Sequence, residues 1–376
     1  MYRNILWSLS AASLITLGAC ADAADPAGTS QLPVDRAGSE SIVSSTANSV
    51  TRIVGNWQVT ITDLGMLPIG TFSSAYDINN IGEIVGVATD AGGVRRRVIW
   101  QNGAIVDTLP QPSSATATAW QMNENRQLVG FANQGSGGIG YGVFWDHGTS
   151  LKLQPLPGTV ASGAAANGLN ALGEVAGGGT GGGGGVPTYQ HAALWRNGLL
   201  YQDLGVIPGG NFSMAYDIND ARQVTGTGTA GGTGARQYAF VWTNGVFTVL
   251  PDLPGSFLQS VGRSINTRGD VAGQSNGGEP VVWKNGVVQA LPLPVRQANT
   301  VSEINDSGDV VGSTSGSIGV LWKQGQYIPL DPWPGASVNN SVARGINNQG
   351  VVVGESYFPP GQGVHAVMWT VVPLGG

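Results

Sequence analysis

A unit that recurs seven times fills most of the chain and restricts its fold more than any other feature. Each unit has a small residue, two variable residues, an apolar residue followed by Asn, a turn, and an apolar segment ending in Gly. A Trp follows in each unit. Successive units lie between 39 residues (Asn266 to Asn305) and 49 residues (Asn170 to Asn219) apart. The repeated asparagines are Asn79, Asn123, Asn170, Asn219, Asn266, Asn305 and Asn347. Seven units of this length, made of short strands, predict the blades of a seven-bladed β-propeller.

Turn signals give the order of strands inside a unit. Residues 79–82 read Asn-Asn-Ile-Gly, and Asn in the first and Gly in the fourth position favour a type I turn. A strand at 73–78 therefore turns into a strand at 83–88. An Asn-Gly pair follows the repeated Trp in four units, as at Asn102 and Gly103, and predicts a type I′ hairpin. We expect four antiparallel strands in each blade, named A to D in chain order.

The last unit lacks its D strand, because the chain ends soon after Trp369. A spare strand stands before the first unit, at residues 57–64, and its Asp-Leu ending matches the D strand that ends at Asp203-Leu204. We therefore predict that residues 56–376 form an all-β, seven-bladed propeller with four-stranded blades, and that the N-terminal strand closes the ring.

The first residues indicate export. Residues 1–19 have a basic start and an apolar run of 13 residues, 5–17, as in a signal peptide. Residues 17–20 read Leu-Gly-Ala-Cys, and Cys20 is the one cysteine of the chain, which is typical of a bacterial lipobox with a lipidated Cys20. The alternative is ordinary cleavage after Ala21 or Ala23, giving a soluble periplasmic or secreted protein. An Asp after the lipidated Cys commonly retains a lipoprotein at the inner membrane. Since residue 21 is Ala, the lipidated form is expected at the outer membrane or cell surface.

Residues 20–55, rich in Ser, Ala and Thr, are expected to form a flexible tether.

Composition excludes several classes of function. The net charge of -6 argues against a nucleic-acid partner, which needs a basic face. Charged residues are only 11% of the chain and Gly numbers 60, which argues against a helical bundle. The three histidines are His147, His191 and His365, and none has metal-ligand spacing. We expect no metal, no cofactor, no membrane contact beyond the lipid, and a monomer.

The repeats resemble those of bacterial extracellular HAF-family proteins. The hallmarks of that family are Asp-Leu-Gly-x-Leu-Pro-Gly-Gly, Ala-x-x-Ile-Asn, Gly-x-Val-Val-Gly and His-Ala-Phe-Leu-Trp. Residues 203–210 (DLGVIPGG), 215–219 (AYDIN) and 191–195 (HAALW) are close matches, and the resemblance extends from Trp57 to Trp369. The His is kept only at His191 and His365. The resemblance implies an exported repeat protein and no assigned chemistry.

Candidate ligand residues come from the A strands, which line the central channel of a propeller. Two adjacent positions of this strand vary between units and carry polar or aromatic side chains. The ligand-binding candidates are Tyr76, Asp77, Trp120, Tyr216, Asp217, Arg263, Glu303 and Arg344. The alternative is that they only line a water-filled channel. Variable B–C and D–A connections, at 89–94, 133–140, 178–189 and 357–363, share one face, and function usually lies on such loops.

Two classes of function remain. The first is a non-enzymatic binding or scaffold protein that presents the B–C/D–A face to a glycan, peptide or protein. The alternative is a carbohydrate-active enzyme, a lyase or hydrolase, whose Tyr, Arg and carboxylate groups converge at the channel mouth. No catalytic residue is assigned. Residues 273–277 fit G-x-S-x-G without the helix that a nucleophile elbow needs. Arg95, Arg96 and Arg97 are expected in a solvated loop before a C strand.

Overall fold

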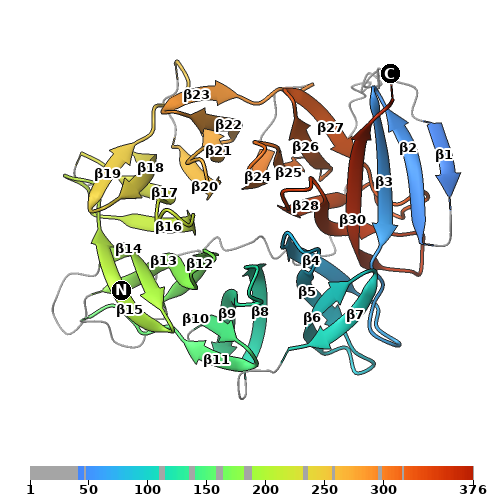
Figure 1. The fold of residues 1–376 in the computed structure, drawn as a ribbon, viewed down its shortest axis with the longest axis horizontal. Helices are drawn as coiled ribbons and strands as arrows, with labels where there is room; N and C mark the ends of the chain where they lie inside the picture. The colour runs from blue at the N-terminus through green and yellow to red at the C-terminus, as the bar shows by residue number, and fades with distance from the viewer. Residues whose placement is uncertain are drawn as a thin grey trace, which may run out of the picture. The chain divides into compact units, whose positions relative to one another are not determined.

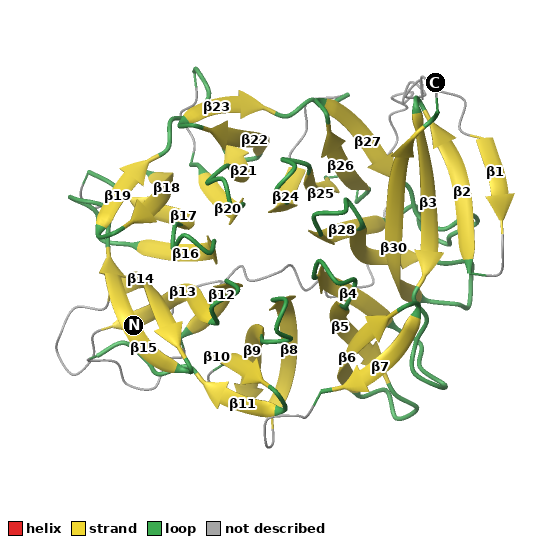
Figure 2. Ribbon diagram, viewed as in Figure 1, coloured by secondary structure: helices red, strands yellow, loops and turns green. Residues whose placement is uncertain are grey.

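The computed structural model is an all-β ring of seven antiparallel sheets (Figures 1 and 2). It describes residues 41–45, 48–109, 115–134, 140–157, 164–181, 189–231, 236–255, 259–294, 299–315 and 317–375. The proposed signal peptide, Cys20 and the first half of the proposed tether lie outside these residues. The sevenfold propeller predicted from the repeats is confirmed.

Every blade has its four strands in the order A, B, C, D from the axis outward. The A strands are β4 (Ser73–Ile78), β8 (Ala115–Met122), β12 (Ala165–Leu169), β16 (Ser213–Ile218), β20 (Val261–Ile265), β24 (Asn299–Ile304) and β28 (Ser341–Ile346). The B strands are β5 (Ile84–Thr89), β9 (Leu128–Gln134), β13 (Glu174–Gly181), β17 (Val224–Thr229), β21 (Val271–Ser275), β25 (Val310–Thr314) and β29 (Val352–Tyr357). These strands place blades 1 to 7 around the ring in chain order.

The outer half of each blade consists of strands C and D, which are joined as a hairpin in blades 1 to 6. The C strands are β6 (Arg95–Gln101), β10 (Tyr141–Asp146), β14 (Tyr189–Arg196), β18 (Gln237–Thr243), β22 (Glu279–Lys284), β26 (Gly319–Lys323) and β30 (Val364–Pro373). The D strands of blades 1 to 6 are β7 (Ala104–Thr108), β11 (Thr149–Lys152), β15 (Leu199–Gly205), β19 (Val246–Val249), β23 (Val287–Ala290) and β27 (Gln326–Leu330). Asn102 and Gly103 have φ of 52° and 76°, as a type I′ turn requires.

The N-terminal strand closes the ring, as predicted. Strand β3 (Trp57–Asp63) pairs antiparallel with β30, from Trp57 opposite Pro373 to Asp63 opposite Val367. The first and last parts of the chain therefore share one sheet (Figure 1). Closure of this kind joins the two ends of the repeat array into one cooperative unit.

The predicted tether at 20–55 is too long. Strand β2 (Ser49–Val54) pairs with β3, and β1 (Ser41–Ser45) pairs with β2, so blade 7 has six strands where four were expected. Arg52 of β2 donates from Nη2 to the carbonyl of Pro332 at 3.0 Å and lies 3.7 Å from Asp331, so this strand is also fixed to blade 6. The Ser and Thr content concealed the strand, because both residues also suit an extended sheet edge.

A β-bulge explains the repeated glycine. The A–B pairing of every blade skips one residue at the same place, for example Tyr76 between Ala75 and Asp77. Two residues before it, the Ser74 carbonyl turns toward Gly86, where a Cβ would lie 2.1 Å from the oxygen. The same approach, at 1.8 to 2.1 Å, recurs at all seven glycines. Only glycine fits opposite this bulge.

The repeated tryptophans belong to the core. All seven are buried, the most exposed being Trp242 at 4%, and the core clusters combine side chains of neighbouring blades. Trp195 also donates from Nε1 to the carbonyl of Gln154 in the preceding connection, at 2.7 Å. The expectation for Arg97 is wrong. It is fully buried in β6, donates to the carbonyls of Ala117 and Leu109, and burial lowers the pKa of its guanidinium to about 10.

Candidate functional site

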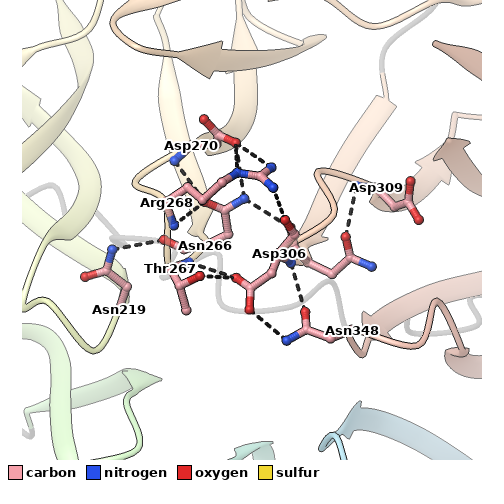
Figure 3. Close-up of polar contacts among 9 residues, drawn as sticks. Asn219, Asn266, Thr267, Arg268, Asp270, Asp306, Asp309 and Asn348 are labelled. Carbon is pink, nitrogen blue, oxygen red and sulfur yellow. Dashed lines mark hydrogen bonds and ion pairs between the residues drawn. The ribbon is translucent and has the colours of Figure 1, made fainter. Parts of the chain in front are cut away.

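The repeated asparagines form a ring of hydrogen bonds around the axis. The Nδ2 of one asparagine donates to the main-chain carbonyl of the asparagine in the next blade, as from Asn219 to Asn266 at 2.9 Å (Figure 3). Six of the seven steps carry this bond, at 2.9 to 3.3 Å. Each Oδ1 also accepts the N–H four residues later, at 2.8 to 3.0 Å, which fixes the A–B turn.

A second circle of bonds joins the same turns one residue further on. The N–H of Thr267 donates to Asp306 and that of Asp306 to Asn348, at 2.9 to 3.0 Å (Figure 3). The N–H of Asn348 donates to Asn80 at 2.8 Å. Arg268 adds bonds to Asp270 and to the carbonyl of Asp306. The face that carries the A–B turns is thus cross-linked from blade to blade, and its polar side chains have structural partners.

The residues that follow the bulges of different blades approach one another, and here the three predicted carboxylates converge. Asp77 accepts from the N–H of Ile78 at 2.7 Å and from Met122 of blade 2 at 2.8 Å. Glu303 accepts from the N–H of Ile346 of blade 7 at 2.8 Å. Each carboxylate therefore holds the main chain of the following blade.

Asp217 is the most connected of the three. It accepts from the N–H of Ile265 and the hydroxyl of Ser264 in blade 5, both at 2.9 Å, and from the N–H of Ile218. Gln121 also reaches it from blade 2 at 3.4 Å. The bond between Gln121 and Asp217 spans the intervening blade 3. In that blade Gly168 occupies the position after the bulge, and a Cβ there would lie 2.6 Å from the Asp217 Cα. Glycine there makes room for the acid.

Burial raises the pKa of all three carboxyl groups. The pKa of Asp77 rises to about 6, and the charge of Asp217 adds to the effect of burial. The pKa of Asp217 is raised by burial against four hydrogen bonds that favour its charged form. Glu303 has a pKa well above its usual range, because burial acts together with the charges of Asp77 and Asp217. These groups hold protons at pH values where ordinary carboxylates are charged.

The bulge residues themselves are half-buried and lie one position nearer the B–C/D–A face than the carboxylates. Trp120 stacks on Phe131 of its own blade at 6.3 Å and donates to the carbonyl of Ala166 of blade 3 at 2.9 Å. Asn167 and Ser302 make the same bond to the next blade, to the carbonyls of Ala215 and Ala343. The bulge residues of the seven blades, at positions 76, 120, 167, 216, 263, 302 and 344, are called the bulge ring below. Three of them therefore link neighbouring blades.

The remaining bulge residues form two arginine–tyrosine pairs. Each pair lies at a junction between two neighbouring blades, called a seam below. The guanidinium of Arg263 lies 4.7 Å from the ring centre of Tyr216 in blade 4, and that of Arg344 lies 5.1 Å from the ring centre of Tyr76 in blade 1. Burial raises the pKa of Tyr76, and Arg344 partly offsets this effect. Arg344 also donates to Glu355 at 3.0 Å. A cation, a carboxylate and a phenol thus meet where blades 7 and 1 join.

The sequence did not reveal that the His and Asp of the repeated His-Ala and Asp-Leu-Gly segments lie together. His365 of β30 lies 2.9 Å from Asp63 of β3, and His191 lies 3.0 Å from Asp203. Each Asp also accepts the N–H two residues on, at Gly65 and Gly205. These pairs bond strand C to strand D. The repeats contained a signal that could have predicted these pairs. Both His residues share one repeat position, and the Asp-Leu-Gly segments share another.

The chemistry that the described residues offer is limited. No group of three or more His, Cys, Asp or Glu side chains among them could hold a metal ion. Ser275 of the G-x-S-x-G segment is buried at the end of a strand and bonds Asp252. In the described part of the chain, no helix is long and apolar enough to cross a membrane.

The B–C/D–A face is described only in part. Connection 89–94 is a turn in which Asp90 accepts the N–H groups of Gly92 and Val94 and pairs with Arg96. Connection 357–363 is also described, whereas most of 133–140 and 178–189 lies outside the described residues.

Comparisons with known proteins agree on the fold alone. No family model matches the chain, and no curated protein matches its sequence. Among solved structures, Raptor from Chaetomium thermophilum is similar with a TM-score of 0.51 and 12% identity, over 82% of this chain and 29% of Raptor. U3-55K gives a TM-score of 0.49 and 13% identity, over 84% and 98% of the two chains.

A puromycin-hydrolyzing peptidase of Mycobacterium tuberculosis gives a TM-score of 0.47 and 11% identity, over 86% of this chain and 59% of the peptidase. This chain therefore spans less than two thirds of the peptidase and less than a third of Raptor. At such identities the likeness concerns architecture and carries no activity.

Proposed function

We propose that the chain is a non-enzymatic binding module that presents its B–C/D–A face, and the bulge residues reached from it, to a glycan. The observation that carries this proposal is the use of the three axial carboxylates. Asp77, Asp217 and Glu303 accept main-chain N–H groups of other blades, so the acids that a hydrolase would need serve as links between blades.

One further feature favours a glycan, and another favours the B–C/D–A face. The bulge ring places half-buried aromatic rings beside neutral polar groups, as with Trp120 and Asn167. Sugar sites commonly combine apolar faces with a few oriented polar groups. The A–B turn face carries short turns that are cross-linked from blade to blade. The variable connections lie on the opposite face, which is therefore the face proposed for the ligand.

A second function has one observation in its favour. Arg344 bonds Glu355 and faces Tyr76, and a lyase needs a cation and a phenol close together. In that alternative the site lies where blades 7 and 1 meet, with Tyr76 as the base. Two facts weigh against it: Glu355 already neutralises Arg344, and the raised pKa of Tyr76 makes the phenol a weaker source of phenolate.

We also propose that the protein is exported, is of the HAF-repeat type, and is anchored through a lipid on Cys20 at the outer membrane or cell surface. The basic start, the apolar run and the single cysteine support this proposal. A monomeric propeller held by this lipid would face the periplasm or the cell exterior, and both compartments contain polysaccharides.

The proposed function is tested on a glycan array with the soluble propeller, residues 41–376, beside the double variant Arg263→Ala/Arg344→Ala. Binding that the double variant loses, at an unchanged melting temperature, supports the bulge ring as the site. An array with no bound glycan contradicts the proposal. Equal binding by the double variant also contradicts the site.

A further inference from the structure

The two arginine–tyrosine pairs are alike in position and differ in one neighbour. Arg263 and Arg344 are both bulge residues, and each bonds the side chain that follows the repeated glycine of its own blade. That side chain is Gln274 for Arg263, with Nε to Oε1 at 3.3 Å, and Glu355 for Arg344, with Nη2 to Oε1 at 3.0 Å. One arginine is held by a neutral amide and the other by a carboxylate.

This difference decides the charge of the two seams. Arg344 and Glu355 form an ion pair, so their charges cancel. Within the described residues, Arg263 has no carboxylate at ion-pair distance; its contacts are Gln274 and the face of Tyr216. Its cationic group is therefore uncompensated, although the chain as a whole carries a net charge of -6.

Arg263 is also held in one orientation. Gln274 accepts from its Nε and is itself anchored by a bond from Nε2 to the Asn299 carbonyl at 3.0 Å. The Tyr216 ring covers one face of the guanidinium. With Nε occupied and one face covered, no described residue accepts from the terminal N–H groups. These groups have the fork geometry that binds an oxyanion through two bonds.

We infer that Arg263 is the anion-binding group of this propeller, and that the glycan it recognises is acidic and carries a uronate carboxylate. The inference rests on the proposed glycan-binding function and names its ligand class. The carboxylate docks on the terminal N–H groups of Arg263 from the B–C/D–A side of the axial carboxyl groups. The aromatic and amide groups of the bulge ring contact the sugar.

The surrounding charges are compatible with such a ligand. Asp217 lies next to Tyr216 in the chain and bonds Ser264, the neighbour of Arg263. Its pKa is raised by burial, as are those of Asp77 and Glu303. Glu355 and Arg95 lie at the other seam, near Tyr76. Protonation of the axial acids reduces their repulsion of an anion, so uronate binding should strengthen as the pH falls from 8 to 5.

The test exchanges the acceptors that hold the two arginines, Gln274 and Glu355. Calorimetric titration with oligogalacturonide is carried out on the wild type, Gln274→Glu, Glu355→Gln and Arg263→Gln, with melting temperatures measured on the same samples. We expect wild-type binding at one site. Gln274→Glu and Arg263→Gln should weaken it at least tenfold, and Glu355→Gln should add a second site. Neutral galacto-oligosaccharide and a poly-glutamate peptide serve as control ligands.

The outcomes separate this inference from the function on which it rests. Unchanged affinity in a folded Gln274→Glu or Arg263→Gln variant would overturn the inference. Preference for the neutral oligosaccharide would also overturn it, while leaving glycan binding in place. Tighter binding of poly-glutamate than of oligogalacturonide would assign the site to an acidic peptide and overturn the assignment of a glycan ligand. Absence of all glycan binding, on the array and here, would remove the proposed function itself.

Discussion

His365 and Asp63 lie 302 positions apart in the chain and 2.9 Å apart in the fold, across the strand pair that closes the ring. The other ring nitrogen of His365 lies 3.0 Å from the Gln362 carbonyl. A carboxylate and a carbonyl are both acceptors, so both nitrogens can donate only when the imidazole is protonated, and these contacts favour the charged form. Phe358 stacks on the ring at 4.0 Å. The last and first parts of the propeller are thus joined by an ion pair as well as by the sheet.

This pair makes ring closure depend on pH. Burial alone would lower the pKa of His365, but the bond and the charge of Asp63 outweigh it and the pKa is raised. A raised His pKa stabilises the fold fully below the unfolded value of about 6.5 and no longer does so once the pH exceeds the folded value. We expect His365→Gln to cost about 1 kcal/mol at pH 6 and far less at pH 9, measured by urea unfolding at both values.

His191→Gln is the matched control. It breaks the same kind of pair, with Asp203, between strands that are neighbours in the chain. Its effect should be smaller at both pH values, because Asp203 is more exposed than Asp63 and no ring closure depends on the pair. Equal losses in the two variants would show that closure gains nothing from the His365 pair.

The axial carboxyl groups predict the opposite trend to ordinary acid denaturation. Because the folded pKa of Glu303 lies above its unfolded value, the folded state holds the proton longer, and stability falls as the pH rises between the two values. Glu303→Gln imitates the protonated acid. It should match the wild type near pH 4.5 and exceed it by about 1 kcal/mol at pH 8. Denaturant unfolding from pH 4.5 to 8 measures this, and a variant less stable than wild type at pH 8 would contradict it.

The asparagine ring is expected to contribute strongly to stability. Asn266→Ala removes the hydrogen bond that Nδ2 donates to the Asn305 carbonyl. It also removes the two bonds that Oδ1 accepts from the N–H groups of Arg268 and Asp270. With about 1 kcal/mol for each bond, the variant should lose roughly 2 to 4 kcal/mol of unfolding free energy. Differential scanning calorimetry measures the fall in melting temperature.

Asn79 offers an internal control for that variant. Its side chain bonds Glu83 within its own turn, and among the described residues it makes no bond to the next blade. Asn79→Ala should therefore cost less than Asn266→Ala. A larger loss in Asn79→Ala would mean that the turn, rather than the bond between blades, explains the repeated asparagine.

The sequence predicted the parts of the fold that are local. Asn-Gly at 102–103 and the spacing of the repeats depend on short-range turn chemistry, and both are confirmed. Closure by residues 57–64 could be predicted because the missing strand of one unit matched the spare strand before another. Strand β2 was missed, since Ser49 and Thr51 fit a linker as well as a strand.

The arrangement at the axis could not be predicted in the same way. That Tyr76 is a bulge residue depends on the pairing of two strands, which one strand's sequence does not contain. The approach of Gln121 to Asp217 crosses a blade and depends on Gly168, so it follows from ring geometry. The pairing of Arg344 with Glu355, and of Arg263 with Gln274, likewise required the side chains to be placed.

The proposed anchor gives a prediction outside the propeller. Cys20→Ser removes the sulfur that would carry the lipid and leaves every described contact intact. The protein should move from the membrane fraction to the soluble fraction, and labelling with a fatty-acid analogue should disappear. Labelling that persists in the variant would place the lipid elsewhere, and a wild type found only in the soluble fraction would favour cleavage after Ala21 or Ala23.

The central claim is that the propeller binds its glycan without cleaving it. The most direct measurement is the chain length of acidic and neutral polysaccharides, determined by mass spectrometry after long incubation with the wild-type protein. We predict that every bound polysaccharide is recovered at its starting length, because Asp77, Asp217 and Glu303 are engaged with main-chain N–H groups of other blades. Shortened chains formed by the wild type and absent with Tyr76→Phe or Arg344→Ala would contradict the claim and establish a carbohydrate-active enzyme at the seam of blades 7 and 1.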